Sequence, residues 1–352
     1  MNASRYYVIL PFALLPVLGW YLGASWISLI VSFLVIPLVD QIVGTDERNP
    51  DDTQSTRTFW YDLALLFYVP LHFGLIVWGA WAASGMAGLG AQLHVAVAVG
   101  VVTGSLGITI AHELGHRRSN LHRWLSQLLQ IGVCYGHFYI EHNRGHHVRV
   151  ATPDDPASAR FNQNFYAFWL RSVFAGFASA CHLEAAWLRQ RRSSLSSWRN
   201  RMFWYVASSA AMGAVLQALF GWVAVQFFVV QAVTAFTLLE LVNYVEHYGL
   251  TRERRGERYE RVNPTHSWND SHIISNAFLI NLQRHSDHHA NPSRPYPALR
   301  HFNQSPQLPA GYPLMVLIAL VPPLWFAVMN PRVERWRASV GSATPATMET
   351  AQ

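Results

Sequence analysis

Two long stretches of this chain carry almost no charge, and this restricts the folds that it can adopt. From residue 58 to 112 the single charged side chain is Asp62, and residues 202–239 contain none. A helix that crosses a bilayer needs about 20 mostly apolar residues. The sequence therefore predicts an all-α integral membrane protein with six transmembrane helices, at residues 6–22, 25–43, 58–82, 90–111, 202–220 and 222–245.

The basic residues predict how the chain is oriented. All 26 are arginine, and only Arg5, Arg48 and Arg57 precede residue 117. The turns near residues 24, 86 and 221 carry no charge. By the positive-inside tendency, both termini, the 44–57 loop, the 117–201 stretch and the C-terminal third are expected on the cytoplasmic side. The first apolar run leads directly into a second one without a small-residue cleavage site, so no cleavable signal is expected.

The remaining segments fit one membrane-embedded domain over residues 1–337. Residues 117–142 and 160–201 have helical periodicity with polar flanks, and residues 251–270 are charged and turn-rich. Residues 312–329 are apolar but interrupted by Pro322 and Pro323, which favours a segment in the membrane interface over a seventh span. The tail at 338–352 is expected to be disordered.

Nine histidines are concentrated in four short windows, HELGH, EHNRGHH, NYVEHYG and LQRHSDHH. Neutral imidazole is the commonest protein ligand for transition metals. One ion takes about four ligands in a typical zinc site, so nine candidates indicate two metals. The candidate ligands are His112, His116, His142, His146, His147, His247, His285, His288 and His289.

The spacing within the windows supports this interpretation. Residues three or four apart share one face of a helix, which applies to His112 with His116 and to His142 with His146, with His147 a step round the helix. Three helical ends can then converge on one site, and His247 enters from the end of the sixth span. Isolated histidines are more often packing residues, and we assign that role to His72, His94, His122, His137, His182, His266, His272 and His301.

Other functional classes explain fewer of these features. His112-Glu113-Leu114-Gly115-His116 satisfies the HExxH signature of a zinc protease, but a protease site uses three protein ligands and leaves most of the histidines unexplained. A metal transporter needs ionisable groups inside the spans, which are nearly bare of them. The net charge of +6 is accompanied by no nucleic-acid motif, and the two cysteines exclude an iron–sulfur or rubredoxin-type module within the chain.

Histidine-bound metals with open positions beside an apolar interior suggest oxygen chemistry on a hydrocarbon. Iron with open coordination positions activates O₂, while the protein supplies ligands, dryness and orientation. A hydrocarbon offers no hydrogen-bonding group, so an apolar channel must position it. The substrate is expected to enter that channel from the lipid.

The chain also resembles a known family, on residues that extend from about 35 to 333. The segments HELGHRRS, YGHFYIEHNRGHHVRVATPDDPAS, NYVEHYGL, RVNPTHSWNDSHIISN, LQRHSDHHANPSRPYPALRHF and LPAGYP are similar to those of the membrane-bound alkane monooxygenases of the AlkB type. The three histidine boxes are shared in outline with membrane fatty acid desaturases and xylene monooxygenases. NYVEHYGL and LQRHSDHHA favour the alkane hydroxylase branch. Family members often read HSWNSNH where this chain has Asp270.

The resemblance implies a six-helix bundle with a cytoplasmic cap that holds two non-haem irons on the nine histidines. It implies O₂-dependent hydroxylation of a terminal methyl group to a primary alcohol in the bacterial inner membrane. The implied electron donor is a separate rubredoxin, which is served by an NAD(P)H-dependent rubredoxin reductase. A related hydroxylase or desaturase acting on aromatic methyl groups or fatty acyl chains is the alternative.

Carboxylates near the ligands have a predicted role as well. A ligating histidine usually donates its second N–H to a carboxylate or carbonyl group, which fixes the tautomer of the ring. Glu141 and Asp287 lie inside two of the histidine boxes, and Glu246 precedes His247. We expect Glu246 and Asp287 to accept such hydrogen bonds.

Overall fold

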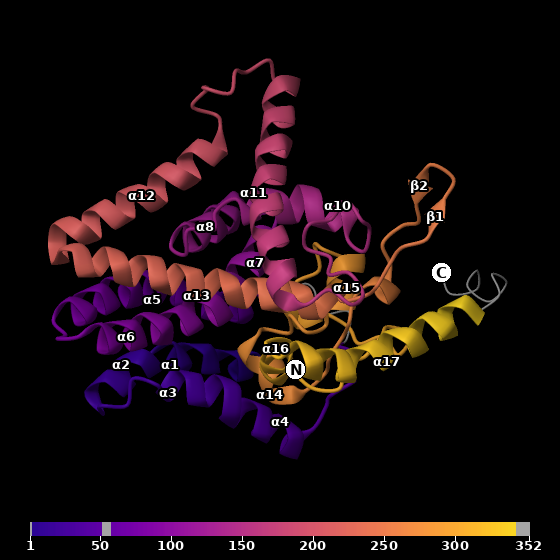
Figure 1. The fold of residues 1–352 in the computed structure, drawn as a ribbon, viewed down its shortest axis with the longest axis horizontal. Helices are drawn as coiled ribbons and strands as arrows, with labels where there is room; N and C mark the ends of the chain where they lie inside the picture. The colour runs from indigo at the N-terminus through magenta and orange to yellow at the C-terminus, as the bar shows by residue number, and fades with distance from the viewer. Residues whose placement is uncertain (1, 51–57, 343–352) are drawn as a thin grey trace.

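The protein is a bundle of long helices, with the first and last elements at the same end as the histidine windows. The computed structural model describes residues 2–50 and 58–342 of the 352-residue chain. Within this part the chain is mainly helical, and its one β-ribbon pairs β1 (Arg254–Arg255) with β2 (Arg258–Tyr259) in antiparallel register. Figure 1 shows the short turns between long helices gathered at the left, opposite α7, α10 and α15.

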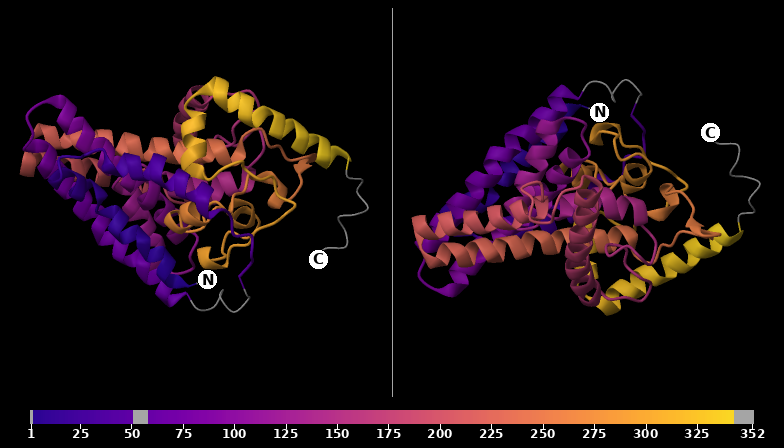
Figure 2. Two further views of the ribbon diagram at one scale, coloured as in Figure 1. Left: turned by 90° about the horizontal axis from the view of Figure 1, so that it is seen from below. Right: turned by 90° about the horizontal axis from the view of Figure 1, so that it is seen from above.

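The first four membrane segments form two helical hairpins. The first rod joins η1 (Ala3–Val8), α1 (Ile9–Ala13) and α2 (Leu15–Tyr21), and the second joins α3 (Ile27–Ile30), η2 (Val31–Val35) and α4 (Ile36–Val43). The next hairpin consists of α5 (Phe59–Ser84), followed by α6 (Leu89–Val102), η4 (Thr103–Ile108) and α7 (Thr109–Gly115). In Figure 2 these hairpins and the α12–α13 hairpin lie side by side in both views.

The rest of the chain contains both short helical segments and long helices. The segments after α7 are α8 (Asn120–Ile131), α9 (Phe138–Ile140), η5 (Glu141–His146) and α10 (His147–Arg149). The long helices α11 (Phe165–Gln190), α12 (Arg201–Phe220) and α13 (Trp222–His247) follow. The C-terminal part contains η6 (Pro264–His266), α14 (Ile273–Phe278), α15 (His285–Ala290), η7 (Tyr296–Ala298), α16 (Tyr312–Ala319) and α17 (Pro322–Ser342).

Five of the six predicted spans are confirmed as helices long and apolar enough to cross a membrane. They are Ala3–Tyr21, Phe59–Ser84, Leu89–Gly115, Arg201–Phe220 and Trp222–His247. The remaining prediction, 25–43, corresponds to a 17-residue apolar helix, Ile27–Val43. At 1.5 Å per residue it is about 25 Å long, which is shorter than the roughly 30 Å hydrocarbon core.

The C-terminal apolar segment is sharply bent, as its two prolines suggest. α16 and α17 meet at an angle of 120°, and α17 begins with Pro322 and Pro323, which lack the N–H groups needed to continue α16. Placement of this segment in the membrane interface stays a prediction. α17 continues to Ser342, so the first residues of the expected disordered tail are helical. Residues 343–352 lie outside the described residues.

α13 is the central helix of the bundle, and small residues let its neighbour approach closely. A Cβ atom at Gly104 would lie 2.7 Å from the Cα of Ala235, and one at Gly100 would lie 2.6 Å from the Cβ of Thr234. Such small residues are typical of helix interfaces in membranes, where close backbone packing replaces hydrophobic driving force. Thr103 Oγ1 also donates to Gln231 Oε1 at 3.0 Å. These contacts fix α7 beside the end of α13.

A buried carboxylate joins α11 to α12 and to the second histidine box. Glu184 is 1% exposed and accepts hydrogen bonds from Arg201, at 3.1 Å from the backbone N and 2.7 Å from Nη2. Arg144, from the EHNRGHH window, lies 3.3 Å from the same carboxylate. Burial raises the pKa of Glu184, but the hydrogen bonds and charge of Arg201 outweigh this and hold it below its usual value. The carboxylate is therefore ionised at neutral pH.

Replacing Glu184 with alanine is expected to destabilise the protein by about 3 kcal/mol, because it leaves two partly buried arginines without their counter-ion. Since the folded-state pKa is lowered, this contribution is present at neutral pH and is lost as the pH falls through that value. Thermal unfolding of the purified protein at pH 7.5 measures the difference. Glu257→Ala, at an exposed position, is the control. Equal melting temperatures for both variants would contradict the assigned role.

Candidate metal centre

Five of the predicted ligands form one compact group of ring nitrogens. His112 lies in α7 and His116 follows that helix, His142 lies in η5, His147 begins α10 and His288 lies in α15. The ligand atoms of this group lie within 4.8 Å of one another. The Nε2 atom of His142 is 3.1 Å from that of His116 and 3.0 Å from that of His147, which is 3.1 Å from that of His288.

The other four predicted ligands form a second group beside the first. It consists of His146, His247, His285 and His289, which are all buried and have ligand atoms within 4.8 Å of one another. His146 Nε2 lies 3.2 Å from His289 Nε2, and His285 Nε2 lies 3.3 Å from His247 Nε2. The rings of His142 and His146 stack with centroids 5.3 Å apart, so the two groups are adjacent.

The spacing of these nitrogens fits metal coordination. With metal–nitrogen bonds of about 2.1 Å, ligands at right angles lie roughly 3.0 Å apart and opposite ligands roughly 4.2 Å apart. Buried Nε2 of His112 has no hydrogen-bond partner among the described residues, which leaves its lone pair available. Burial and the neighbouring rings lower the pKa of His142, His147, His285, His288 and His289 well below the usual value, and burial lowers that of His116 to about 3. These six rings are therefore in the neutral form that binds metals.

The histidines divide into two groups in a way that α-helical spacing does not predict, since that spacing places His142 and His146 on one face. His142 shares its group with His147, five residues later, while His146 belongs to the other group. The reason is that residues 141–146 form a π-helical turn instead of an α-helical one. A π-helix has i→i+5 hydrogen bonds and is frequent at functional sites, so residues five apart come to lie above one another.

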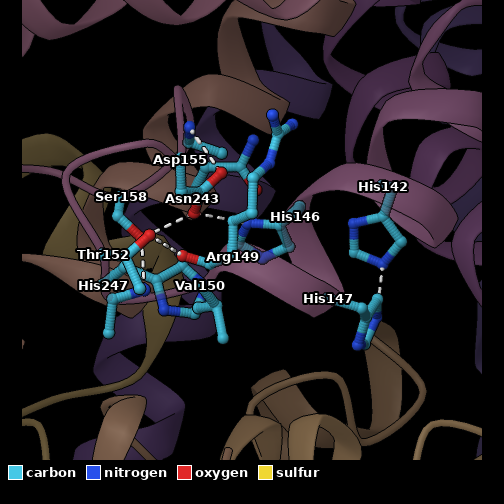
Figure 3. Close-up of polar contacts among 12 residues, drawn as sticks. His142, His146, His147, Arg149, Val150, Thr152, Asp155, Ser158, Asn243 and His247 are labelled. Carbon is cyan, nitrogen blue, oxygen red and sulfur yellow. Dashed lines mark hydrogen bonds and ion pairs between the residues drawn. The ribbon is translucent and has the colours of Figure 1, made fainter. Parts of the chain in front are cut away.

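Asp155 is a partner of the histidines that sequence reasoning missed. Its Oδ2 atom lies 2.9 Å from Nδ1 of His146 and accepts from Ser158 Oγ at 2.6 Å. Ser158 Oγ in turn accepts from the backbone N–H of Ala151 at 2.8 Å. Figure 3 shows Asp155 and Ser158 on the far side of the His146 ring from His142. The signal that could have revealed Asp155 is the run TPDDPAS that follows the second box.

Of the two carboxylates that we predicted as partners, Glu246 contacts a candidate ligand, whereas Asp287 pairs with other groups. Glu246 Oε2 is 3.1 Å from Nε2 of His285, the atom that faces the other ligands, so it borders the metal side of the ring. Asp287 accepts from Arg300 N at 2.9 Å and Asn291 Nδ2 at 2.8 Å, and among the described residues no histidine contacts it. Glu141 pairs with Arg149 at 2.5 Å. Asp287 therefore organises the loop after α15 and does not orient a ring.

The other polar residues singled out in the sequence have structural contacts. Glu113 of the HExxH pattern forms an ion pair with Arg117 at 2.9 Å and accepts from Tyr296 N at 3.2 Å, which leaves it unsuited to act as a protease base. Asp270 accepts from Nδ1 of His272 at 2.7 Å. The eight histidines assigned to packing lie outside both groups, namely His72, His94, His122, His137, His182, His266, His272 and His301.

An apolar cavity of about 80 Å³ reaches both histidine groups. His112 and His142 of the first group and His285 of the second line it at one end. Its other walls are mainly aliphatic or aromatic and come from α1, η2, α4, η4, α13, α14 and α16. They include Phe12, Phe33, Ile36, Leu238, Val242 and Val316. An apolar chain in this cavity would have one end beside the two candidate metal positions.

Comparison with known proteins relates the chain to membrane oxygenases. Residues 89–318 match the family model described as fatty acid desaturase. Alkane 1-monooxygenase 2 of Pseudomonas aeruginosa is 43% identical over 332 residues, which cover 91% of this chain and 88% of that protein. The alkane 1-monooxygenase of Acinetobacter baylyi is 40% identical over 309 residues (86% and 76%). The xylene/toluene monooxygenase hydroxylase component XylM of Pseudomonas putida is 28% identical over 344 residues (96% and 90%).

Replacing Asp155 with asparagine is expected to lower metal affinity about 10- to 100-fold, because the carboxylate that accepts from His146 fixes the tautomer and basicity of the ring. Metal content after dialysis against graded chelator concentrations measures the change. Asp154→Asn is a matched control, because Asp154 is adjacent in the sequence and its carboxylate is exposed. Equal retention of metal by both variants would remove Asp155 from the site.

Proposed function

Because the chain belongs to the alkane 1-monooxygenase family, we propose that it hydroxylates the terminal methyl group of alkanes at a di-iron centre. The nine histidines hold the two irons, five on one and four on the other. One observation carries the proposal, namely that both groups of buried imidazole nitrogens border the same apolar cavity. The reaction consumes an alkane, O₂, two electrons and two protons, and it yields a primary alcohol and water.

The protein residues contribute positioning and exclusion of water. An alkane has no polar group, so the walls of the cavity orient it by shape alone. Phe12, Phe33 and Leu238 contribute apolar surface, and the chain end reaches the level of His112, His142 and His285. The irons supply the reductive activation of O₂. Buried neutral imidazoles leave open positions for that chemistry without introducing negative ligands.

The end of the bundle that carries the histidines lies on the cytoplasmic side of a bacterial inner membrane. The arginines concentrate at this end, whereas the turns at the other end, near Gly23 and Gly221, carry no charge. Asp62, the one charge between residues 58 and 112, pairs with Arg117 at 2.7 Å and so also lies at this end. Reducing equivalents come from a separate rubredoxin, which an NAD(P)H-dependent reductase serves. Alkane enters from the lipid.

Purified protein is expected to contain about two irons per chain and to convert n-alkanes to 1-alcohols when supplied with rubredoxin, reductase and NAD(P)H. Alanine at any of the nine histidines removes activity and lowers the iron content, whereas His94→Ala and His182→Ala retain both. Elemental analysis and gas chromatography of the products over a graded alkane series measure these outcomes. A single zinc per chain, or conversion of aromatic methyl groups in preference to alkanes, would refute the proposal.

Association with the electron donor is expected to be electrostatically steered. Arg254 and Arg255 are exposed on the β1–β2 ribbon, and rubredoxins are generally acidic. Arg191 is less suitable for a test, since it packs over Trp187 at 4.1 Å. Steering weakens with salt, because the screening length is roughly 8 Å at physiological ionic strength.

Reversing both charges, Arg254→Glu with Arg255→Glu, should raise the KM for rubredoxin severalfold at low salt and leave the KM for alkane unchanged. Steady-state turnover at several salt concentrations provides the measurement. A rubredoxin KM that responds neither to salt nor to the reversal would place the docking site elsewhere.

A further inference from the structure

A second cavity lies beside α13, where Phe236 borders it. Its volume is about 390 Å³, and it is enclosed by α11, α12, α13 and the turn before α9. Representative lining residues are Cys134, Val173, Phe174, Tyr205, Val206 and Phe236. Phe174 and Val206 are 67% and 56% exposed, so the cavity opens on the outer surface between α11 and the spanning helix α12. None of the nine predicted ligands lines it.

A small cavity lies between this space and the histidine site and shares lining residues with both. Its volume is about 20 Å³, and it shares Tyr135 and His137 with the second cavity. On its other side it shares Phe138, His142 and Asn243 with the substrate cavity. The three cavities are therefore consecutive, and the histidine site lies at the inner end of the series.

His137 lies at the junction and has unused hydrogen-bonding capacity. Its side chain is buried (7% exposed), and no hydrogen bond joins its ring to another residue within residues 2–50 and 58–342. The ring lies between those of Tyr135 and Phe177, with centroids 4.3 and 5.2 Å away. Burial lowers the pKa of His137 to about 4, so the ring is neutral. A neutral imidazole offers one donor and one acceptor, which suits a hydroxyl group.

The wall of the junction is held in place by defined contacts. The ring of Tyr135 stacks on that of Phe236 at 4.9 Å with an interplanar angle of 12°. Its hydroxyl donates to Glu240 Oε1 at 2.7 Å, and Glu240 is buried in α13. Cys134, which precedes it, has a φ of 55°, a conformation that non-glycine residues rarely adopt. These contacts present His137 to the cavities in a fixed orientation.

We propose that the second cavity binds the primary alcohol formed at the histidine site, with His137 recognising its hydroxyl group, and serves as its route back to the lipid. This rests on the proposed function. Hydroxylation adds a polar group to a chain held in an apolar cavity, where an unpaired hydroxyl is unfavourable. Of the two residues that the small cavity and the second cavity share, Tyr135 already donates to Glu240, so His137 is the one that can pair with the hydroxyl group. Aromatic walls beyond it accommodate the apolar chain. An alkane lacks the hydroxyl and gains nothing from this site.

Photolabelling of the purified full-length protein in nanodiscs tests the site without requiring turnover. The probe is a long-chain primary alcohol that carries a diazirine on its chain, applied to iron-loaded and to chelator-treated protein. Labels are expected on α11 and α12, between residues 173 and 177 and between 202 and 209, in both preparations. An unlabelled 1-alkanol of equal length should compete, and the corresponding n-alkane should compete at least several times more weakly.

Two variants separate recognition of the hydroxyl from occupation of the space. His137→Phe keeps a ring but removes the hydrogen bond, so the concentration of 1-alkanol needed for competition should rise about two- to tenfold. Val173→Trp fills the cavity and should abolish labelling of α12. Leu170→Trp is the matched control, because Leu170 is 55% exposed on the same helix and lines none of the three cavities.

Several results would overturn the inference. Labels confined to the substrate cavity would do so, and so would equal competition by alkane and alcohol, or competition by phospholipid alone. Unchanged labelling in Val173→Trp would have the same meaning. These experiments measure binding and not turnover. Failure of the proposed function would be seen separately, as an iron-loaded protein that forms no alcohol from any alkane.

Discussion

The convergence of nine buried imidazoles is the arrangement on which the rest of the structure depends. Their ring nitrogens approach to 3.0–3.3 Å, and they come from the end of α7, from η5 and α10, from the end of α13 and from α15. These segments are far apart in the sequence, so their meeting point fixes how the bundle is assembled. Close packing of α13 on Gly100 and Gly104 then sets the distance between the two spanning helices that carry ligands.

Around this centre, charged side chains pair with one another and leave the imidazoles neutral. Glu113 pairs with Arg117, Glu141 with Arg149, and Glu184 with Arg144 and Arg201. Each of these arginines lies beside a histidine box or anchors the helix that covers it. These carboxylates pair with arginine and lie outside the two groups of candidate ligands. Asp155 and Glu246 are the exceptions, since each of them contacts a candidate ligand directly.

The sequence predicted the spans and indicated which histidines lie together, because both depend on local pattern. Absence of charge over residues 202–239 specifies apolar helix whatever the tertiary structure, and the recurrent boxes identify candidate ligands without coordinates. The assignment of His146 and His147 to different groups could not be predicted, because it depends on a π-helical turn that α-helical spacing hides. Asp155 contacts His146 through a turn of TPDDPAS, and Asp287 faces Arg300 despite its place between ligands. Closeness in sequence to a candidate ligand therefore did not predict which carboxylate contacts an imidazole ring.

In the proposed route, the position of α13 separates the alkane that enters the bundle from the alcohol that leaves it. Leu238 and Val242 of this helix border the substrate cavity, whereas Phe236 borders the second cavity and Glu240 holds Tyr135 at the junction. Residues of a single helix thus line both spaces. In the proposed route, a chain that acquires a hydroxyl group gains a hydrogen-bonding partner at His137, which an alkane cannot use. In this proposed route, direction follows from the chemistry of the product.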